Sequence, residues 1–274
     1  MAGGDGAAVT TNQTTVLKIG GSVLEPRPSP AFMAALARTV AAGEKLVIVH
    51  GGGKALTGLL ARLGVATEFK NGLRVTGAAT LQAAVMAFAG EVNTQLVAAL
   101  NRAGVAAVGL TGLDAASVRA RVAKLELGAV GIPEAAEARL PQALLDSGYV
   151  PVYASLASDG MGGVLNVNAD QFAAALAGAL GAQRMLFVTD VPGVLDADGG
   201  LIPEISLAGM EAMAASGALR GGMLPKADAC RAALAGGAGT VTILGAEAAL
   251  RLDEIMAGQG SGSGTPCGTQ VTRA

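Results

Sequence analysis

Hydrophobic positions along the chain alternate between short β-branched runs and longer alanine-rich stretches. The short runs predict strands over residues 15–19, 45–50, 105–110, 149–154, 184–189 and 239–244. The longer stretches predict helices over residues 30–42, 54–63, 78–102, 140–147, 170–180, 207–216, 225–235 and 246–256. Several of the strands are apolar at successive residues, which is typical of strands buried on both faces of a parallel sheet. The pattern therefore predicts an α/β fold: a three-layer αβα sandwich around an open, mainly parallel sheet.

Other segments depart from this alternation. Residues 67–75 and 117–130 have the pattern of hairpins, and we expect them to project from the sheet, where they are in a position to cover a site. Residues 1–14 are small and polar and predict a flexible tail. Residues 260–268, GSGSGTPCG, predict a flexible loop or tail.

The composition excludes several classes of protein. Of 274 residues, 51% are hydrophobic and 15% charged, so the chain can bury a sizeable core in one or two units. A net charge of −2 argues against a nucleic-acid partner. The uncharged stretch 75–90 is shorter than the about 20 apolar residues of a membrane span, and residues 1–11 lack a signal-peptide pattern, so no membrane association and a cytoplasmic location are expected. Two distant cysteines and a single histidine, His50, indicate neither a disulfide framework nor a metal centre.

Glycine clusters follow the first two predicted strands. Gly20 and Gly21 come after the first strand, and a run of three glycines that includes Gly52 and Gly53 comes after the second. Such loops let the backbone approach a ligand, and the N–H groups of a following helix favour anions. Lys18 lies inside the first strand, and it is either an edge residue in solvent or a charge that faces a polar cleft. The adjacent glycine loop favours the cleft and a phosphate ligand.

The motifs occur in a characteristic order along the chain: VLKIGGS, LVIVHGGG, KNGLRVT, GLTGLD, SGYVPVYASL, LNVNADQFAAALA, LFVTDVPGVLD and GGMLPKADA. Together they resemble the amino-acid kinase superfamily and, within it, the N-acetylglutamate kinases of arginine biosynthesis. The resemblance covers residues 16–270. It implies an N-terminal lobe over residues 15–181 that binds the acyl amino acid and a C-terminal lobe over residues 182–274 that binds the nucleotide. It also implies that ATP, with Mg²⁺ held mainly through the nucleotide phosphates, phosphorylates the γ-carboxylate of N-acetyl-L-glutamate.

Phosphoryl transfer between two anions needs positioning and charge neutralisation more than covalent chemistry. The resemblance implies that Lys18 contacts the transferring phosphoryl group and that Lys226 stabilises the leaving-group side. It implies further that Asp170 holds both lysines in position. From the residues alone, Asp170 is a capping or first-turn acid of the following helix, and both roles are compatible. The acceptor carboxylate is already ionised at pH 7, so His50 is expected to have a structural role rather than that of a base.

The resemblance also assigns residues to the two substrates. Arg74 would bind the α-carboxylate of the acyl amino acid, with Asn166 and the backbone N–H groups of Gly52 and Gly53 also on this substrate. Gly20 and Gly21 would lie against the nucleotide phosphates. The adenine and ribose would be held by two segments: Asp190, Val191, Pro192, Gly193, Val194 and Leu195, and then Ala218, Leu219 and Arg220. No protein metal ligand is assigned.

Two alternatives to an N-acetylglutamate kinase stay open. One is a sister kinase that acts on carrier-bound aminoadipate or glutamate, and the other is a non-catalytic sensor of amino acid or nucleotide. KNGLRVT and NVNADQ favour the first interpretation, and the presence of Lys18, Asp170 and Lys226 together argues against a sensor. The resemblance implies a homodimer formed through the N-terminal lobe, with the apolar segment 78–102 as the interface helix. Residues 1–14 do not resemble the helix of arginine-inhibited hexamers, so strong inhibition by arginine is not expected.

Overall fold

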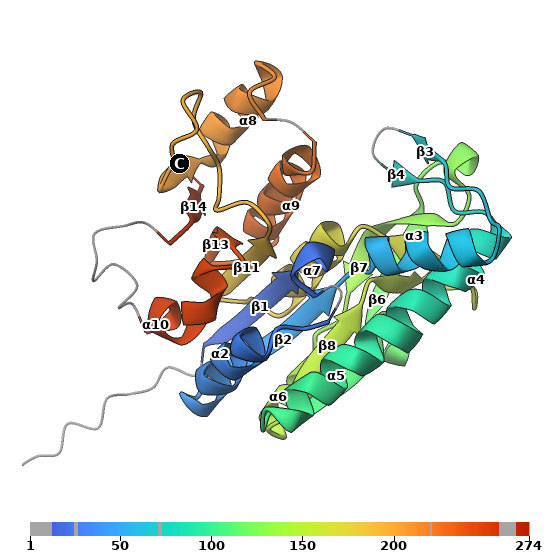
Figure 1. The fold of residues 1–274 in the computed structure, drawn as a ribbon, viewed down its shortest axis with the longest axis horizontal. Coiled ribbons are helices and arrows are strands. Elements are labelled where there is room, and N and C mark those ends of the chain that lie inside the picture. The colour runs from blue at the N-terminus through green and yellow to red at the C-terminus, as the bar shows by residue number, and fades with distance from the viewer. Residues whose placement is uncertain (1–12, 25–26, 71–72, 220, 258–266, 274) are drawn as a thin grey trace, which may run out of the picture.

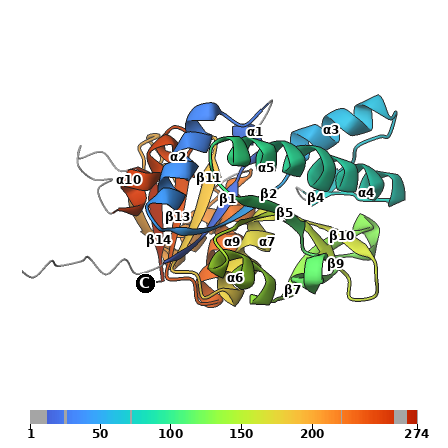
Figure 2. The same cartoon turned by 90° about the horizontal axis from the view of Figure 1, so that it is seen from below.

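The computed structural model describes residues 13–24, 27–70, 73–219, 221–257 and 267–273. An eight-stranded sheet runs through the protein, and helices cover both of its faces (Figures 1 and 2). Its strands, in order across the sheet, are β12 (Glu204–Ser206), β14 (Thr269–Thr272), β13 (Thr240–Gly245), β11 (Arg184–Thr189), β1 (Thr14–Ile19), β2 (Lys45–His50), β8 (Val150–Ala154) and β5 (Ala107–Thr111). Neighbouring strands are parallel except for the antiparallel pair of β13 and β14. The predicted fold class is confirmed.

The helices form two layers, seen above and below the sheet in Figure 2. The layer on one face contains α2 (Pro30–Ala41), α5 (Asn93–Arg102) and α10 (Leu252–Met256). The layer on the other face contains α6 (Arg139–Asp146), α7 (Ala169–Ala179) and α9 (Met223–Ala235), with α8 (Leu207–Ala215) packed against α9. Shorter helical segments are α1 (Gly21–Leu24), α3 (Gly53–Arg62), α4 (Ala78–Val85), the π-helix η1 (Met86–Val92), and the 3₁₀ turns η2 (Asp114–Ala116), η3 (Leu125–Leu127) and η4 (Ala248–Arg251).

Two small β-structures lie beside the main sheet. β6 (Val118–Val122), β7 (Val130–Ala136), β9 (Leu156–Ser158) and β10 (Val164–Val167) close into a four-stranded barrel. The hairpin predicted over residues 117–130 is present as the antiparallel pair of β6 and β7, but its second strand begins only at residue 130. The other predicted hairpin is formed by β3 (Phe69–Lys70) and β4 (Leu73–Arg74), which lie near α3 at the far end of the N-terminal part (Figure 1).

The six predicted strands are all present, with bounds that differ by at most two residues. The segment 246–256 is not one helix, because the chain forms the 3₁₀ turn η4 before α10 begins. Most of the predicted loop 260–268 and residues 1–12 of the predicted tail lie outside the described residues, while Thr14 already belongs to β1. All strands after residue 181 lie on one side of β1, so the predicted boundary between lobes falls between β1 and β11.

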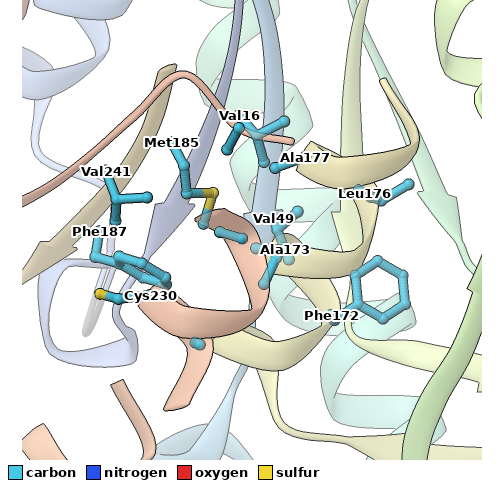
Figure 3. Packing of buried hydrophobic residues seen from close by; sticks show 14 of the residues in the cluster. Val16, Val49, Phe172, Ala173, Leu176, Ala177, Met185, Phe187, Cys230 and Val241 are labelled. Carbon is cyan, nitrogen blue, oxygen red and sulfur yellow. The ribbon is translucent and has the colours of Figure 1, made fainter. Parts of the chain in front are cut away.

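The core on the α7 side of the sheet is built from alternate residues of the central strands. Val16 of β1, Phe187 of β11 and Val241 of β13 point toward α7 and α9, where they meet small residues such as Ala173 and Cys230 (Figure 3). Small side chains on α7 and α9 let these helices pack closely on the larger side chains of the sheet. This packing fixes how the first turns of α7 and α9 lie relative to β1.

One described helix is long and apolar enough to cross a membrane by length and composition. It is the continuous helix Ala78–Arg102, formed by α4, η1 and α5, and 44% of its apolar window is buried inside the protein. Leu96 and Leu100 on its inner face are fully buried in the core beside the sheet. The helix therefore packs as a core element of this fold.

Candidate active site

Lys18 lies in the middle of the sheet, because β1 pairs with β11 on one side and β2 on the other. Of the two interpretations open for this residue, the edge position is therefore wrong. Successive side chains of a strand point to opposite faces, so Lys18 shares the face of Val16, which is covered by α7 and α9. Its side chain is only 13% exposed and reaches the first turn of α7.

Asp170, in the first turn of α7, lies between two lysines. Its Oδ1 is 2.8 Å from the Nζ of Lys18, and its Oδ2 accepts a hydrogen bond of 3.0 Å from the Nζ of Lys226 in the first turn of α9. Lys226 also lies 5.2 Å from the centre of the Phe187 ring. Asp170 and Lys226 are each only 5% exposed. The three residues thus form a buried charge cluster with a net charge of +1.

The local sequence explains this placement. Asn168 caps α7, since its side chain accepts hydrogen bonds from the N–H groups of Asp170 and Gln171. Asp170 is therefore a first-turn acid rather than the cap itself, and its charge is favourable near a helix N-terminus. Lys226 has the opposite relation to α9, where a positive charge opposes the helix dipole. An anion beside Lys226 is therefore favourable, and Asp170 supplies one.

Electrostatics within the cluster keep the carboxylate charged. Burial by itself would raise the pKa of the Asp170 carboxyl, but the charges and hydrogen bonds of Lys18 and Lys226 outweigh it and hold that pKa below the ordinary value. Burial lowers the pKa of the Lys18 ammonium, with Asp170 and, more weakly, Asp190 acting in the opposite direction. The cluster consequently keeps one carboxylate between the Nζ atoms of the two lysines.

A cavity of about 270 Å³ opens beside this cluster. Its lining includes all the residues predicted for the acyl amino acid together with Lys18, Gly21 and Asp170: Gly52, Gly53, Arg74 and Asn166. Apolar side chains line another part of its wall: Leu56, Phe69, Leu73, Phe88 and Val130. Its size suits a small ligand of amino-acid dimensions. The cavity can receive an anionic ligand that also carries an apolar group.

Arg74 is held firmly at the far end of the cavity from Asp170. Its Nη2 donates to Thr57 Oγ1 at 2.8 Å and to the Gly53 carbonyl at 3.3 Å, and its Nη1 donates to Thr67 Oγ1 at 3.2 Å. The guanidinium lies 4.6 Å over the ring of Phe69. Partial burial lowers the pKa of Arg74, yet a guanidinium stays charged at neutral pH. Arg74 is thus a preorganised cation facing the cavity.

The triple-glycine loop lies against the π-helix η1. A Cβ atom at Gly52 would come within 2.6 Å of the Phe88 ring, so only glycine allows this close approach. Gly53 begins α3, and its N–H group is one of the free donors at that helix N-terminus. The loop therefore presents backbone donors to the cavity and is backed by an aromatic side chain.

His50 supports the same loop from inside the protein. It is fully buried; its Nδ1 lies 2.7 Å from the Gly51 carbonyl oxygen and its Nε2 lies 2.9 Å from Asn93 Nδ2. The Asn93 amide nitrogen can only donate, so Nε2 accepts and the ring proton is on Nδ1, donated to Gly51. Burial lowers the pKa of His50 to about 4. The imidazole is therefore neutral and structural, as expected from the sequence.

Of the residues predicted for the nucleotide, Gly20 and Gly21 lie beside the charge cluster, and Gly21 lines the cavity, whereas those after residue 181 lie in the C-terminal part, outside its lining. Gly20, whose N–H donates to the Val188 carbonyl at 2.8 Å, and Gly21 follow β1. Asp190, Val191, Pro192, Gly193, Val194 and Leu195 follow β11, and Ala218 and Leu219 follow α8. Val194 and Leu219 are buried, which gives them a packing role in these loops. Arg220 lies outside the described residues.

Several residues of the site were not expected from the sequence. Thr57 and Thr67 hold Arg74, Phe88 backs the glycine loop, and Ser155 and Asn168 line the cavity. Asn168 carries a readable signal, since asparagine two residues before a first-turn acid is a common helix cap. The others come from elements distant in the sequence, and no local pattern marks them.

Comparison with known proteins gives a consistent result. The sequence model of the amino acid kinase family matches residues 13–245. An acetylglutamate kinase of Solibacter usitatus is 43% identical over 90% of this chain and 97% of its own length, and one of Acidiphilium cryptum is 40% identical over 84% and 82%. The crystal structure of smu.665 from Streptococcus mutans has a TM-score of 0.82 and 29% identity, and covers 95% of this chain and 99% of its own. A carbamate kinase from Giardia lamblia bound to AMP-PNP shares the fold at a TM-score of 0.70 and 15% identity, with 96% and 99% of the two chains covered.

Proposed function

The chain belongs to the amino acid kinase family and, within it, to the acetylglutamate kinases, and from this premise we propose how its site works. The enzyme transfers the γ-phosphoryl group of ATP to the side-chain carboxylate of N-acetyl-L-glutamate and forms N-acetyl-L-glutamyl 5-phosphate for arginine biosynthesis. The observation that carries the mechanism is the buried cluster of Lys18, Asp170 and Lys226 beside a cavity with Arg74 at its far end. Two cations flank the reaction centre, and a third cation selects the acceptor.

The acceptor binds in the cavity with its two carboxylates at opposite ends. The guanidinium of Arg74 matches the α-carboxylate, because its planar fork can donate two parallel hydrogen bonds. Asn166 and the N–H groups of Gly52 and Gly53 contact the same molecule. The apolar wall beside them suits the methyl group of the acetyl substituent. This arrangement points the γ-carboxylate toward Lys18.

The chemistry needs no general base. A carboxylate with an ordinary pKa near 4 is already ionised at neutral pH and attacks the γ-phosphorus directly. A bond forms between a carboxylate oxygen of the acceptor and the γ-phosphorus, while the bond from the γ-phosphorus to the bridging oxygen of ATP breaks. ADP leaves with the electron pair of the broken bond. Lys18 neutralises charge on the transferring group, and Lys226 neutralises charge on the leaving side. Asp170 acts as a positioning residue for both ammonium groups.

ATP occupies the C-terminal part, with residues 190–195 and 218–220 around its adenine and ribose and Gly20 and Gly21 near its phosphates. Among the residues that the structure describes, no three His, Cys, Asp or Glu side chains are placed to hold a metal ion. We expect a Mg²⁺ ion to be held mainly through oxygen atoms of the nucleotide phosphates. When bound, the ion would offset the negative charge of the phosphates.

The enzyme works as a homodimer in the cytoplasm. Exposed apolar residues on the helix Ala78–Arg102, Val85 and Met86, support an interface through the N-terminal part. Light scattering of the purified protein tests this proposal: a mass of twice 26.7 kDa is expected, and a monomer or a hexamer contradicts it. Activity is expected to change little when arginine is added.

Hydroxylamine trapping tests the proposed reaction. The purified protein with Mg-ATP and N-acetyl-L-glutamate should yield the hydroxamate of an acyl phosphate in amounts equal to the ADP formed. A panel with N-acetyl-L-aspartate, L-glutamate and N-acetyl-L-2-aminoadipate distinguishes a sister kinase, which would prefer another acceptor. If none of these acids gives an ATP-dependent hydroxamate, the proposed function is contradicted.

A further inference from the structure

Thr76 forms hydrogen bonds to both of the residues, Arg74 and Asn166, whose side chains the proposed function places on the acceptor. It follows β4, two residues after Arg74, and is completely buried, whereas the residues of β4 are half-buried. Its Oγ1 donates to the Arg74 carbonyl oxygen at 2.9 Å and accepts a hydrogen bond from Asn166 Nδ2 at 3.2 Å. One hydroxyl group therefore joins the hairpin that carries Arg74 to the strand that carries Asn166.

The backbone of Thr76 is fixed just as firmly as its side chain. Its N–H donates to the Leu127 carbonyl and its carbonyl accepts from the Ala129 N–H, each at 2.8 Å, which makes a bridge to Gly128. Gly128 has φ +67, and a Cβ there would collide with the Thr76 carbonyl oxygen, so glycine is required. The Ala129 carbonyl in turn accepts from the N–H of Asn166 at 2.9 Å. Thr76 and Asn166 are thus anchored to the same short segment.

The hydroxyl group also determines which way the Asn166 carboxamide faces. A threonine hydroxyl has a single proton, and here that proton goes to the Arg74 carbonyl. The partner at Asn166 must then be a donor, which places Nδ2 toward Thr76 and turns Oδ1 away from it. Without the hydroxyl group, the two orientations of the carboxamide would no longer be distinguished at this contact. Donor and acceptor could then exchange places on the cavity side.

We propose that Thr76 is a positioning residue that sets the spacing of Arg74 and Asn166 and thereby the selectivity for an acceptor with an α-carboxylate. This inference rests on the proposed function, because it assigns Arg74 and Asn166 to the acceptor. The two-residue strands β3 and β4 are too short to hold a rigid hairpin by their own pairing. The anchor at Thr76 therefore fixes the backbone of Arg74, while contacts with α3 and Thr67 hold its guanidinium.

The test compares Thr76→Val, which replaces the hydroxyl with a methyl group of similar size, with Thr76→Ser, which keeps it. Thr76→Ala is made in parallel, because it removes the hydroxyl without placing a methyl group in that position. The matched control is Thr39→Val on α2, where a fully buried hydroxyl donates to the Ala35 carbonyl at 2.9 Å away from the cavity. Each variant is assayed with N-acetyl-L-glutamate and with 4-acetamidobutyrate, which has the acetamido group and the reacting carboxylate but no α-carboxylate.

Loss of the two hydrogen bonds should lower kcat/KM for N-acetyl-L-glutamate about tenfold in Thr76→Val and Thr76→Ala, mainly through KM. The same variants should change kcat/KM for 4-acetamidobutyrate by less than about twofold, because this acceptor has no α-carboxylate for Arg74 to bind. The KM for ATP should likewise change by less than about twofold, an effect smaller than the loss of one typical hydrogen bond. Thr76→Ser and Thr39→Val should keep the selectivity of the wild type.

Two kinds of failure are distinguishable. If the wild type does not phosphorylate N-acetyl-L-glutamate, the proposed function and the role of Thr76 are both wrong. If the wild type is active but the variants without the hydroxyl lose both acceptors equally, or retain the wild-type selectivity, only the role of Thr76 is wrong. A purely structural role would lower thermal stability and lower kcat/KM for both acceptors alike. The ratio of the kcat/KM values for the two acceptors therefore decides between the interpretations.

Discussion

The single histidine of the chain allows a sharp prediction about stability at acidic pH. In the folded protein, burial lowers the pKa of His50 from 6.5 to about 4. An unfolded chain binds a proton at this residue below pH 6.5, whereas the folded protein does not do so until about pH 4. The contribution of neutral His50 to the free energy of unfolding is therefore fully present above pH 6.5 and is lost as the pH falls toward 4. The perturbation to apply is acidification, with His50→Gln as the variant that removes the titrating group.

The expected magnitude follows from that shift. At about 1.4 kcal/mol for each pH unit of separation, the total effect is about 3 kcal/mol, of which about 2 kcal/mol falls between pH 7 and pH 5. Over this window the carboxylates change charge little, and no other histidine is present. The prediction therefore concerns one identified group.

Urea unfolding at pH 7, 6 and 5, at one protein concentration, measures this effect. The wild type should lose about 2 kcal/mol more than His50→Gln between pH 7 and pH 5. The variant itself should be less stable at pH 7, because Gly51 and Asn93 lose their buried partner. Equal pH dependence in the two proteins would refute the structural account of a neutral, buried imidazole that supports the glycine loop.

Other predictions concern the charge cluster and the cavity. Asp170→Asn should lower the free energy of unfolding by about 3–5 kcal/mol, since two buried ammonium groups lose their counter-ion, and Mg-ATP should raise its Tm more than that of the wild type in a thermal-shift assay; an equal rise contradicts this. Arg74→Lys should raise the KM for N-acetyl-L-glutamate at least about tenfold, because the fork is lost, with the KM for ATP unchanged in steady-state kinetics. Gly52→Ala should lower stability by about 1–3 kcal/mol through a collision with Phe88, whereas Gly53→Ala, where nothing lies within 4 Å, should leave chemical denaturation nearly unchanged.

Long buried strands were the part of the fold that could be predicted most closely. The bounds of β2 and β11 agree with the prediction, because both strands are apolar at successive positions and are buried on both faces. The strands β9, β10, β12 and β14 were missed. Each has only three or four residues, too few for a period-two pattern. β12 and β14 depend on pairing with segments distant in the sequence, whereas β9 and β10 pair with each other.

The π-helix η1 was also missed, since nothing in the apolar pattern of residues 78–102 distinguishes it from the α-helix on either side. Its wide turn is compatible with the packing of Phe88 against Gly52 and with the hydrogen bond from Asn93 to His50. These contacts join elements that are about 40 residues apart in the chain. They arise from tertiary packing, which a local pattern does not record.

For the candidate site, the identity of the charged residues was predicted, and their surroundings were not. Lys18, Asp170 and Lys226 meet in the structure. Side chains alternate between the two faces along β1, which explains why Lys18, like Val16, faces α7 rather than the opposite layer. The partners of Arg74 could not be predicted, because Thr57 lies on α3 and Thr67 on the loop before β3. Threonine is common in loops and on helix surfaces, and only the fold shows which threonine hydroxyl groups accept hydrogen bonds from Arg74.

The most direct test of the central claim is the rate of a single turnover in Lys18→Met, measured as transfer of ³²P from γ-labelled ATP to N-acetyl-L-glutamate at saturating substrates. The substitution removes the ammonium group that Lys18 contributes to the charge cluster and leaves the other residues of β1 unchanged. If Lys18 neutralises the transferring group, the rate should fall about 10²–10³-fold, the loss expected when one preorganised donor is removed from a reaction centre, while both substrates still bind. A rate within about tenfold of the wild type, with both substrates bound, would contradict the proposed mechanism.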